Sequence, residues 1–306
     1  MRRRVSVLLI LMLALAVPKL WTAGAVVATI PIEIARNKTI VPVNVGGVSF
    51  RLILDTGMAG EGILIFHREK IDTSTGLWSA AEMRGAGPGG VVRAITNESG
   101  SFTVGNVAFE GQRIIVLDSD IYKGFPTDGV IGYSLFGRYA VGIDFAKKVL
   151  TLYDPEGFSA GPDWDSVPMY FKDNRIPWID LMIATGGESP VRISAYIDSA
   201  SGEAVELLRR EANKFTLPKV TEKRLLGRGL SGDIYGEDGT ISRMRIGPHE
   251  LKAIRAAIPL ASVRSRQRDA DAIVGNGTLA RFDVIFDYAH ERLHLRPNSH
   301  FDDPFE

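Results

Sequence analysis

Short apolar runs on either side of glycine turns cover much of the chain. The clearest pairs are residues 40–45 with 50–54, joined at 46–47, and residues 178–183 with 191–197, joined at 186–187. Runs of about four to eight residues rich in Val and Ile, with glycine between them, are typical of β-hairpins. The pattern therefore predicts a mostly β protein.

One stretch has helical spacing instead. In residues 203–215, Ala204, Leu207, Leu208 and Ala212 recur at near-helical intervals. Apolar residues three and four positions apart form one face of a helix. We therefore expect the longest helix of the chain in this stretch.

An internal repeat organises the chain. Three pairs of landmarks are each 143 residues apart: Asp55 with Asp198, Gly132 with Gly275, and Asp144 with Asp287. Landmarks that keep one spacing indicate two copies of one structural unit. We expect an N-terminal lobe over residues 26–155, a C-terminal lobe over 156–297, and a polar tail over 298–306.

The first 25 residues have the features of a secretory signal peptide. Arginines at positions 2–4 precede an apolar run over residues 5–17, and the small residues Ala23, Gly24 and Ala25 follow. The run is shorter than a membrane span of about 20 residues needs, so cleavage after residue 25 is expected rather than anchoring. The sequence therefore predicts a secreted or periplasmic protein with no stable membrane span after cleavage.

Charge and cysteine content exclude several classes of function. The chain has 36 basic and 36 acidic residues, and 32 basic residues remain after cleavage. Without a basic excess there is no field to attract phosphates, so nucleic-acid binding is not expected. The chain contains no cysteine, which excludes disulfides, thiolate metal sites and a cysteine nucleophile.

Two acidic motifs carry the candidate chemistry. Asp55 is followed by Thr56 and Gly57, and Asp198 is followed by Ser199 and Ala200, each after an apolar run. Two buried carboxylates brought together cannot both ionise, so they share one proton. One can then deprotonate a water while the other protonates a carbonyl oxygen, which is general acid–base hydrolysis of an amide.

The paired motifs resemble the aspartic proteases of the pepsin and retropepsin superfamily. In both copies a glycine, Gly132 or Gly275, follows the acid by 77 residues. The nearest form is similar to secreted bacterial retropepsin-like proteases with two units in one chain. The resemblance implies an all-β, bilobal fold from an internal duplication, a monomer, no cofactor or metal, and a peptide or protein substrate.

The resemblance also implies residue roles. The catalytic pair would be Asp55 and Asp198. Support for the pair would come from Thr56, Gly57, Ser199, Ala200 and Ser201. Loops packed behind the acids would contain Gly132 and Gly275. Two flaps over the substrate, in residues 85–92 and 229–235, would contribute Gly89, Gly90, Val91, Val92, Ile234 and Tyr235.

Two positions depart from the family pattern. Ala200 stands where glycine is usual, and Met58 stands where the first lobe usually has a hydroxyl residue. The second lobe keeps a hydroxyl at Ser201. We hypothesise that this hydroxyl donates to Asp198, which would then ionise more readily than Asp55.

Two other functions remain open. A relative with the same fold that binds peptides without cleaving them is favoured by Ala200 and Met58. A zinc hydrolase is suggested by residues 290–294, which read His-Glu-Arg-Leu-His, with His300 beyond them. Zinc binding needs His290 and His294 on one helical face, but the repeat aligns this segment with a predicted strand–turn–strand.

Overall fold

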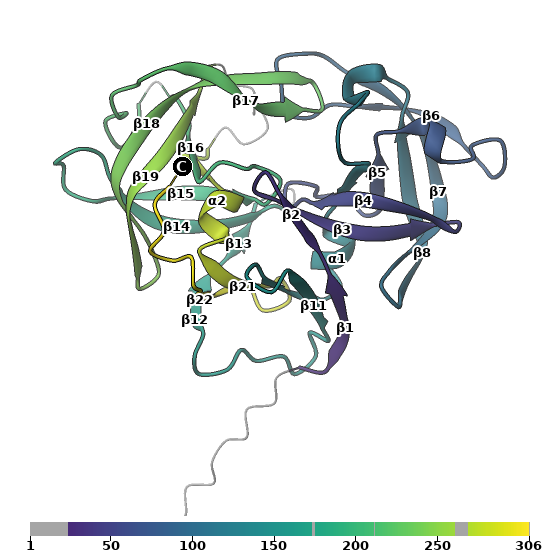
Figure 1. The fold of residues 1–306 in the computed structure, drawn as a ribbon, viewed down its shortest axis with the longest axis horizontal. Helices are drawn as coiled ribbons and strands as arrows, with labels where there is room; N and C mark the ends of the chain where they lie inside the picture. Colours follow the sequence, from purple (N-terminus) through teal and green to yellow (C-terminus); the bar gives the residue numbers. More distant parts are fainter. Residues whose placement is uncertain (1–23, 173–174, 211, 261–268, 306) are drawn as a thin grey trace, which may run out of the picture.

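A computed structural model describes residues 24–172, 175–210, 212–260 and 269–305. The predicted signal peptide lies outside these residues except for Gly24 and Ala25. Two lobes built from β-strands lie side by side over a shared sheet (Figure 1). Within the described residues the α-helices are short, α1 (Tyr133–Phe136) and α2 (Asn276–Leu279), and neither has the length to cross a membrane. The prediction of an all-β, bilobal fold is confirmed.

The N-terminal lobe contains an eight-stranded sheet with the order β2-β3-β4-β9-β5-β8-β7-β6. Its strands are β2 (Glu33–Ala35), β3 (Lys38–Val45), β4 (Val48–Leu54), β5 (Ile63–Ile65), β6 (Ser79–Met83), β7 (Val92–Val104), β8 (Val107–Leu117) and β9 (Gly129–Ile131). Two 3₁₀ turns, η1 (Arg68–Lys70) and η2 (Asp120–Tyr122), lie between strands.

The C-terminal lobe repeats this order as β13-β14-β15-β20-β16-β19-β18-β17. Its strands are β13 (Tyr170–Phe171), β14 (Pro177–Ala184), β15 (Val191–Asp198), β16 (Val205–Leu207), β17 (Lys223–Gly229), β18 (Gly232–Ile246), β19 (His249–Pro259) and β20 (Ala272–Gly275). Each strand has a counterpart at the same place in the other lobe, so the sequence repeat is a structural duplication. Both predicted hairpins are also confirmed, as β3–β4 and β14–β15.

A six-stranded sheet with the order β1-β11-β10-β21-β22-β12 joins the lobes. Its strands are β1 (Val26–Pro31), β10 (Ala140–Asp144), β11 (Val149–Tyr153), β12 (Asp165–Pro168), β21 (Phe282–Asp287) and β22 (Arg292–Pro297). Val141 of β10 pairs with Phe286 of β21, and Phe286 packs edge-on against Phe136 at 5.2 Å between ring centroids. One continuous apolar core therefore runs beneath both lobes.

The helix predicted over residues 203–215 is wrong. Val205–Leu207 forms strand β16, which pairs with β19 on one side and β20 on the other. Val205 and Leu207 are both fully buried in the core. Pairing with two neighbouring strands outweighs the local helical spacing, because burial between strands stabilises this segment more than helix propensity does.

A buried aspartate braces the same point in each lobe. Asp128 accepts a hydrogen bond from the Arg51 amide at 2.8 Å and pairs with the Lys70 ammonium. In the second lobe Asp271 accepts from the Ser194 amide at 3.0 Å and pairs with Lys214 at 2.6 Å. Each aspartate directly precedes a strand, β9 or β20. Its hydrogen bond ties that strand to the neighbouring strand, β4 or β15, which leads into the acid motif.

Asp128→Ala is expected to lower the free energy of unfolding by about 2–3 kcal/mol, because the Arg51 amide loses its buried acceptor. The matched control is Asp118→Ala, which removes an ion pair to Arg68 at 2.6 Å between two half-exposed side chains. That change should cost about 1 kcal/mol or less. Urea unfolding monitored by tryptophan fluorescence measures both. Equal losses in the two variants would contradict the bracing role.

Candidate active site

The two acids of the repeated motif lie where central strands of the two lobes end. Asp198 is the last residue of β15, and Asp55 directly follows β4. Leu54 pairs in parallel with Ile131 of β9, and Asp198 pairs in parallel with Gly275 of β20. Asp198 is 5% exposed, while Asp55 is half-buried.

Reciprocal hydrogen bonds join the two motifs across the lobe boundary. The Thr56 amide donates to Ser199 Oγ at 3.0 Å, and the Ser199 amide donates to Thr56 Oγ1 at 2.9 Å. Each hydroxyl then donates its own proton to a carbonyl of the other lobe, Thr56 to Ile197 and Ser199 to Leu54, both at 2.8 Å. All four groups are buried, so leaving any of them without a partner is costly. The network therefore holds the two motifs in one relative position.

The carboxylates of the two acids face a common space. A Cβ built on Gly57 would lie 3.0 Å from Asp55 Oδ1 and 3.8 Å from Asp198 Oδ1. The Gly57 amide donates to Asp55 Oδ1 at 2.7 Å, and the Ala200 amide donates to Asp198 Oδ1 at 3.0 Å. Neither Gly57 nor Ala200 has a positive φ, so the backbone accepts the Ala200 methyl without strain.

The two predicted loop glycines lie directly behind the acid motifs. A Cβ on Gly132 would lie 2.4 Å from the Asp55 carbonyl oxygen, and one on Gly275 would lie 2.2 Å from the Glu203 carbonyl oxygen. Both positions thus require glycine because backbone approaches too closely for a side chain. The residue after each glycine also bonds to its acid loop. The Tyr133 amide donates to the Met58 carbonyl at 3.1 Å, and the Asn276 amide donates to the Ser201 carbonyl at 2.8 Å.

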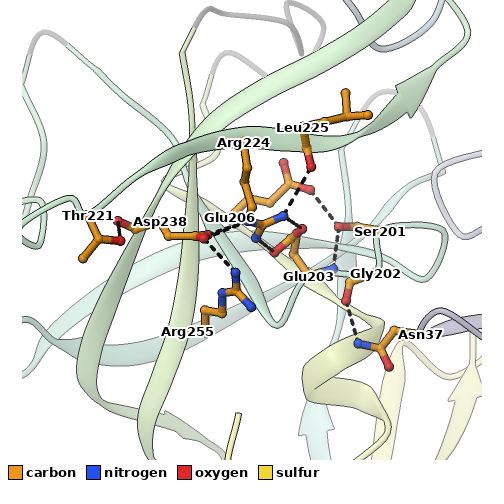
Figure 2. Close-up of polar contacts among 10 residues, drawn as sticks. All are labelled: Asn37, Ser201, Gly202, Glu203, Glu206, Thr221, Arg224, Leu225, Asp238 and Arg255. Carbon is orange, nitrogen blue, oxygen red and sulfur yellow. Dashed lines mark hydrogen bonds and ion pairs between the residues drawn. The ribbon is translucent and has the colours of Figure 1, made fainter. Parts of the chain in front are cut away.

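The hypothesis that the Ser201 hydroxyl donates to Asp198 is wrong. Ser201 Oγ donates to Glu206 Oε1 at 2.7 Å (Figure 2). The Ser201 amide is the group that donates to Asp198 Oδ1, at 3.1 Å. Glu206 points from the centre of β16 toward the acid loop and is 3% exposed. Its counterpart in β5 is Leu64, one residue short of the repeat spacing. The sequence does contain a sign of this role, because the second copy has an acid, Glu206, where the first copy has a leucine.

A chain of charged groups connects the second acid loop to the strands of its flap. Arg224 of β17 grips Glu203 with two hydrogen bonds, at 2.7 and 2.9 Å, and also donates to Asp238 at 2.8 Å (Figure 2). Arg255 approaches the same Asp238 at 2.7 Å. Burial raises the pKa of Asp238, but the hydrogen bonds from the two arginines outweigh it and hold this pKa below its usual range.

A turn of the N-terminal lobe also supports the second acid loop. Asn37, in the β2–β3 turn with a φ of 56°, donates from its side chain to the Gly202 carbonyl at 3.1 Å. The neighbouring Lys38 ammonium donates to the Ala200 carbonyl. Asn276 completes the contact by donating to the Asn37 carbonyl at 2.8 Å. Sequence reasoning missed Asn37, Lys38 and Asn276 as site residues, because each contact crosses between lobes.

The two predicted flaps are hairpins whose tips contact each other. Residues 84–91 link β6 to β7, and Leu230 and Ser231 link β17 to β18. Ser231 Oγ accepts from the Gly85 amide at 3.2 Å and donates to the Gly90 carbonyl at 2.9 Å. Both backbone groups of Ser231 are also bonded. Its amide donates to the Ala86 carbonyl at 2.8 Å, and its carbonyl accepts from the Gly89 amide at 2.6 Å. Ser231 is therefore the joint between the flaps.

The other predicted flap residues have different surroundings. Val92 packs against an apolar cluster of the N-terminal lobe, and Ile234 is buried at 5% exposure. Val91 and Tyr235 are about half exposed, at 48% and 47%. The Lys223 ammonium lies over the Tyr235 ring at 5.8 Å.

The second flap is also anchored to the N-terminal lobe just below its tip. Arg228 Nη1 donates to the Ile121 carbonyl at 2.9 Å, and the Tyr122 hydroxyl donates to the Arg228 carbonyl at 3.4 Å. Burial, with the nearby negative charge of Asp55, raises the pKa of Tyr122 well above its ordinary value. Tyr122 therefore remains a neutral donor, and it lies close enough to Asp55 to sense its charge.

The zinc-like segment forms a β-hairpin turn, not a helix. Residues 288–291 connect β21 to β22, and Glu291 has a φ of 55°. His290 Nδ1 lies 2.8 Å from Asp287 Oδ2, and His294 Nε2 lies 3.7 Å from the same oxygen. The helical face that the zinc motif requires is therefore missing. Among the described residues, no three His, Asp or Glu side chains are grouped as metal ligands.

Comparison with known proteins supports the fold. No protein-family model matches the chain, and no curated protein matches it by sequence. Among solved structures it is similar to an aspartic proteinase from Irpex lacteus, with 12% sequence identity and a TM-score of 0.55. The match covers 89% of this chain and 97% of that one. The chain thus has the fold of pepsin-like aspartic proteinases over nearly its whole length.

Removing the cross-lobe hydroxyls is expected to destabilise the protein. Thr56→Val and Ser199→Ala should each lower the free energy of unfolding by about 1–3 kcal/mol, since each leaves a buried amide without its acceptor. The double variant should lose less than the sum, because the two residues form one network. Thr29→Val, at an exposed position of β1, is the control and should change stability by about 0.5 kcal/mol or less. Additive losses in urea unfolding would contradict a shared network.

The stability of the β21–β22 hairpin should depend on pH through Asp287. Burial raises the pKa of Asp287, but the neighbouring His294 imidazole at 3.7 Å and the hydrogen bonds from His290 outweigh it and bring this pKa below its ordinary value. A lowered pKa stabilises the fold above about pH 4, and this contribution is lost as the pH falls through the folded-state pKa. Asp287→Asn should therefore flatten the fall in unfolding free energy between about pH 5 and 2. Parallel pH profiles for the variant and the wild type would rule out this contribution.

Proposed function

We propose that the protein is an aspartic endopeptidase in which Asp55 and Asp198 form the catalytic dyad. The observation that carries the proposal is the reciprocal bonding of Thr56 and Ser199, which holds one acid from each lobe at a common space. A pair of aspartates that only capped turns would have no need of buried hydroxyls crossed between lobes. The fold shared with aspartic proteinases supports the same reading at a coarser level.

In the proposed reaction the dyad holds one proton between its two carboxyl groups. The ionised carboxylate takes a proton from a water positioned between the acids, and the oxygen of that water attacks the peptide carbonyl carbon. The protonated acid gives its proton to the carbonyl oxygen. Collapse of the resulting tetrahedral species breaks the C–N bond, and the leaving nitrogen takes a proton from the dyad. The two acids titrate as a coupled pair, so the roles belong to the pair.

We propose an extended peptide or protein segment as the substrate. In this proposal the two flaps cover a peptide bound at the dyad, and their edges offer backbone groups to a strand-like ligand. Each lobe contributes its own flap, which supports the retropepsin-like tandem form. The basic and apolar pattern of the first 25 residues supports action outside the cytoplasm.

Of the two residues that favour a non-cleaving peptide binder, Ala200 and Met58, the first is compatible with a catalytic dyad. The Ala200 methyl meets no backbone strain, and its amide still bonds to Asp198. The equivalent of Ala200 in the first lobe, Gly57, makes the same contact to its own acid. Both acids thus keep a bonded carboxylate oxygen.

Replacing either acid of the dyad is expected to abolish cleavage of a peptide library between pH 3 and 7. Asp55→Asn and Asp198→Asn should each lower kcat/KM at least about 1,000-fold, since no shared proton remains to be moved. Asp144→Asn is the matched control, because this aspartate also repeats at the same spacing but caps a hairpin turn by bonding the Lys147 amide at 2.8 Å. It should keep at least half of the wild-type rate.

Adding a chelator to the same assay distinguishes catalysis by the dyad from catalysis by a metal ion. Activity should be unchanged by EDTA, and a statine-type peptide should inhibit it. Cleavage that survives either dyad variant, with the fold verified by circular dichroism, would overturn the assignment. A wild type that cleaves nothing while its folded variants are equally silent would indicate a binding protein instead.

A further inference from the structure

A second apolar cluster lies on the face of the N-terminal sheet opposite the main core. In β4, Leu52 and Leu54 belong to the main core, whereas Ile53 between them points to the other side. We call this group the cleft cluster. Its buried members are Ile53, Leu64, Phe66, Ala94, Ile115, Leu117, Tyr122 and Val130.

The cleft cluster forms an apolar wall between the dyad and the first flap. Met58 and Ala200, which follow the two aspartates by three and two residues, both pack against it. Met83 and Val92, at the two ends of the first flap loop, pack against it as well. A side chain of a peptide bound at the dyad would meet this wall.

Leu230, at the tip of the second flap, packs against the cleft cluster from the other lobe. Its neighbour Ser231 is 3% exposed and bonded on both sides to the first flap. The opposite surface is shaped for Leu230, because a Cβ on Gly85 would lie 2.6 Å from Leu230 Cβ. Figure 1 shows the β17 hairpin reaching from the C-terminal lobe toward the N-terminal lobe.

The second lobe has a corresponding apolar cluster, but different residues pack against it. Its buried members are Ile176, Trp178, Tyr196, Ala270 and Ile273, and Ala59 from the first lobe packs against it. The tip of the first flap, residues 85–90, contains only Gly, Ala and Pro. Within the described residues, therefore, a large apolar flap-tip side chain reaches the cleft cluster of the first lobe and not that of the second.

We propose that Leu230 is a built-in occupant of the substrate subsite formed by the cleft cluster. A peptide side chain of similar size and branching, such as leucine, displaces it when the flaps open. The subsite therefore selects a branched aliphatic residue beside the scissile bond. This inference rests on the proposed function for the location of the bond, but the displacement itself is a binding event.

Peptide binding tests the displacement without any need for turnover. All variants are made on the Asp55→Asn background, and binding is measured by isothermal titration calorimetry. The probes are two heptapeptide amides of alanine with a lysine at each end, one with a single central leucine and one with alanine there. Leu230→Ala should lower the Kd for the leucine peptide about fivefold, because no resident side chain has to leave.

Two comparisons make the result specific. The alanine peptide leaves Leu230 in its place, so its Kd should change less than twofold. Leu225→Ala, in β17 just before the flap tip and 48% exposed, is the matched control and should leave both Kd values within twofold. Leu230→Met, which keeps the side-chain volume, should restore the wild-type Kd for the leucine peptide.

Hydrogen exchange gives a second measurement that needs no ligand. The amides of Gly89 and Ser231 bond across the flap tips, so they should exchange at least fivefold faster in Leu230→Ala and unchanged in Leu225→Ala. An unchanged or weaker Kd for the leucine peptide in Leu230→Ala, or equal gains for both peptides, would overturn the proposal. Tighter leucine binding in a protein that cleaves nothing would uphold it while refuting the protease function.

Discussion

The reciprocal hydrogen bonds between Thr56 and Ser199 are the constraint on which the rest of the structure depends. They join the ends of β4 and β15, two strands from different lobes, at buried groups that cannot exchange protein partners for water without cost. The six-stranded sheet holds the lobes together from below. The crossed hydroxyls determine where the carboxylates of Asp55 and Asp198 lie.

Around that symmetric centre the two copies have diverged in buried residues near the acid motifs and at the flap tips. The first lobe presents Leu64 where the second presents Glu206, which holds the Ser201 hydroxyl beside Asp198. The first flap ends in glycine and proline, whereas the second ends in Leu230 and Ser231. The duplicated unit thus surrounds the two acids with two chemically different sets of residues, which a symmetric pair of identical chains cannot do.

Much of the fold followed from short-range pattern. The hairpins β3–β4 and β14–β15 have apolar runs and glycine turns that dictate their structure locally, and the spacing of the repeat placed both acids and Gly132 with Gly275. Strand β16 could not be predicted, because its three residues are strand only through pairing with β19 and β20. The bond from Ser201 to Glu206 and the meeting of the flaps at Ser231 depend on tertiary contacts that no local pattern records. An acid at Glu206 inside an apolar segment was the one available sign.

Covalent labelling of the two acids tests the central claim most directly. An aryloxymethyl epoxide esterifies a carboxylate when an adjacent carboxylic acid donates a proton to the ring oxygen as the C–O bond opens. A dyad sharing one proton predicts a single ester, found by peptide mass spectrometry on Asp55 or Asp198, and no labelling at either site when the other acid is replaced by Asn. Labelling spread over exposed carboxylates, or an ester that persists in the Asn variants, would contradict a shared proton.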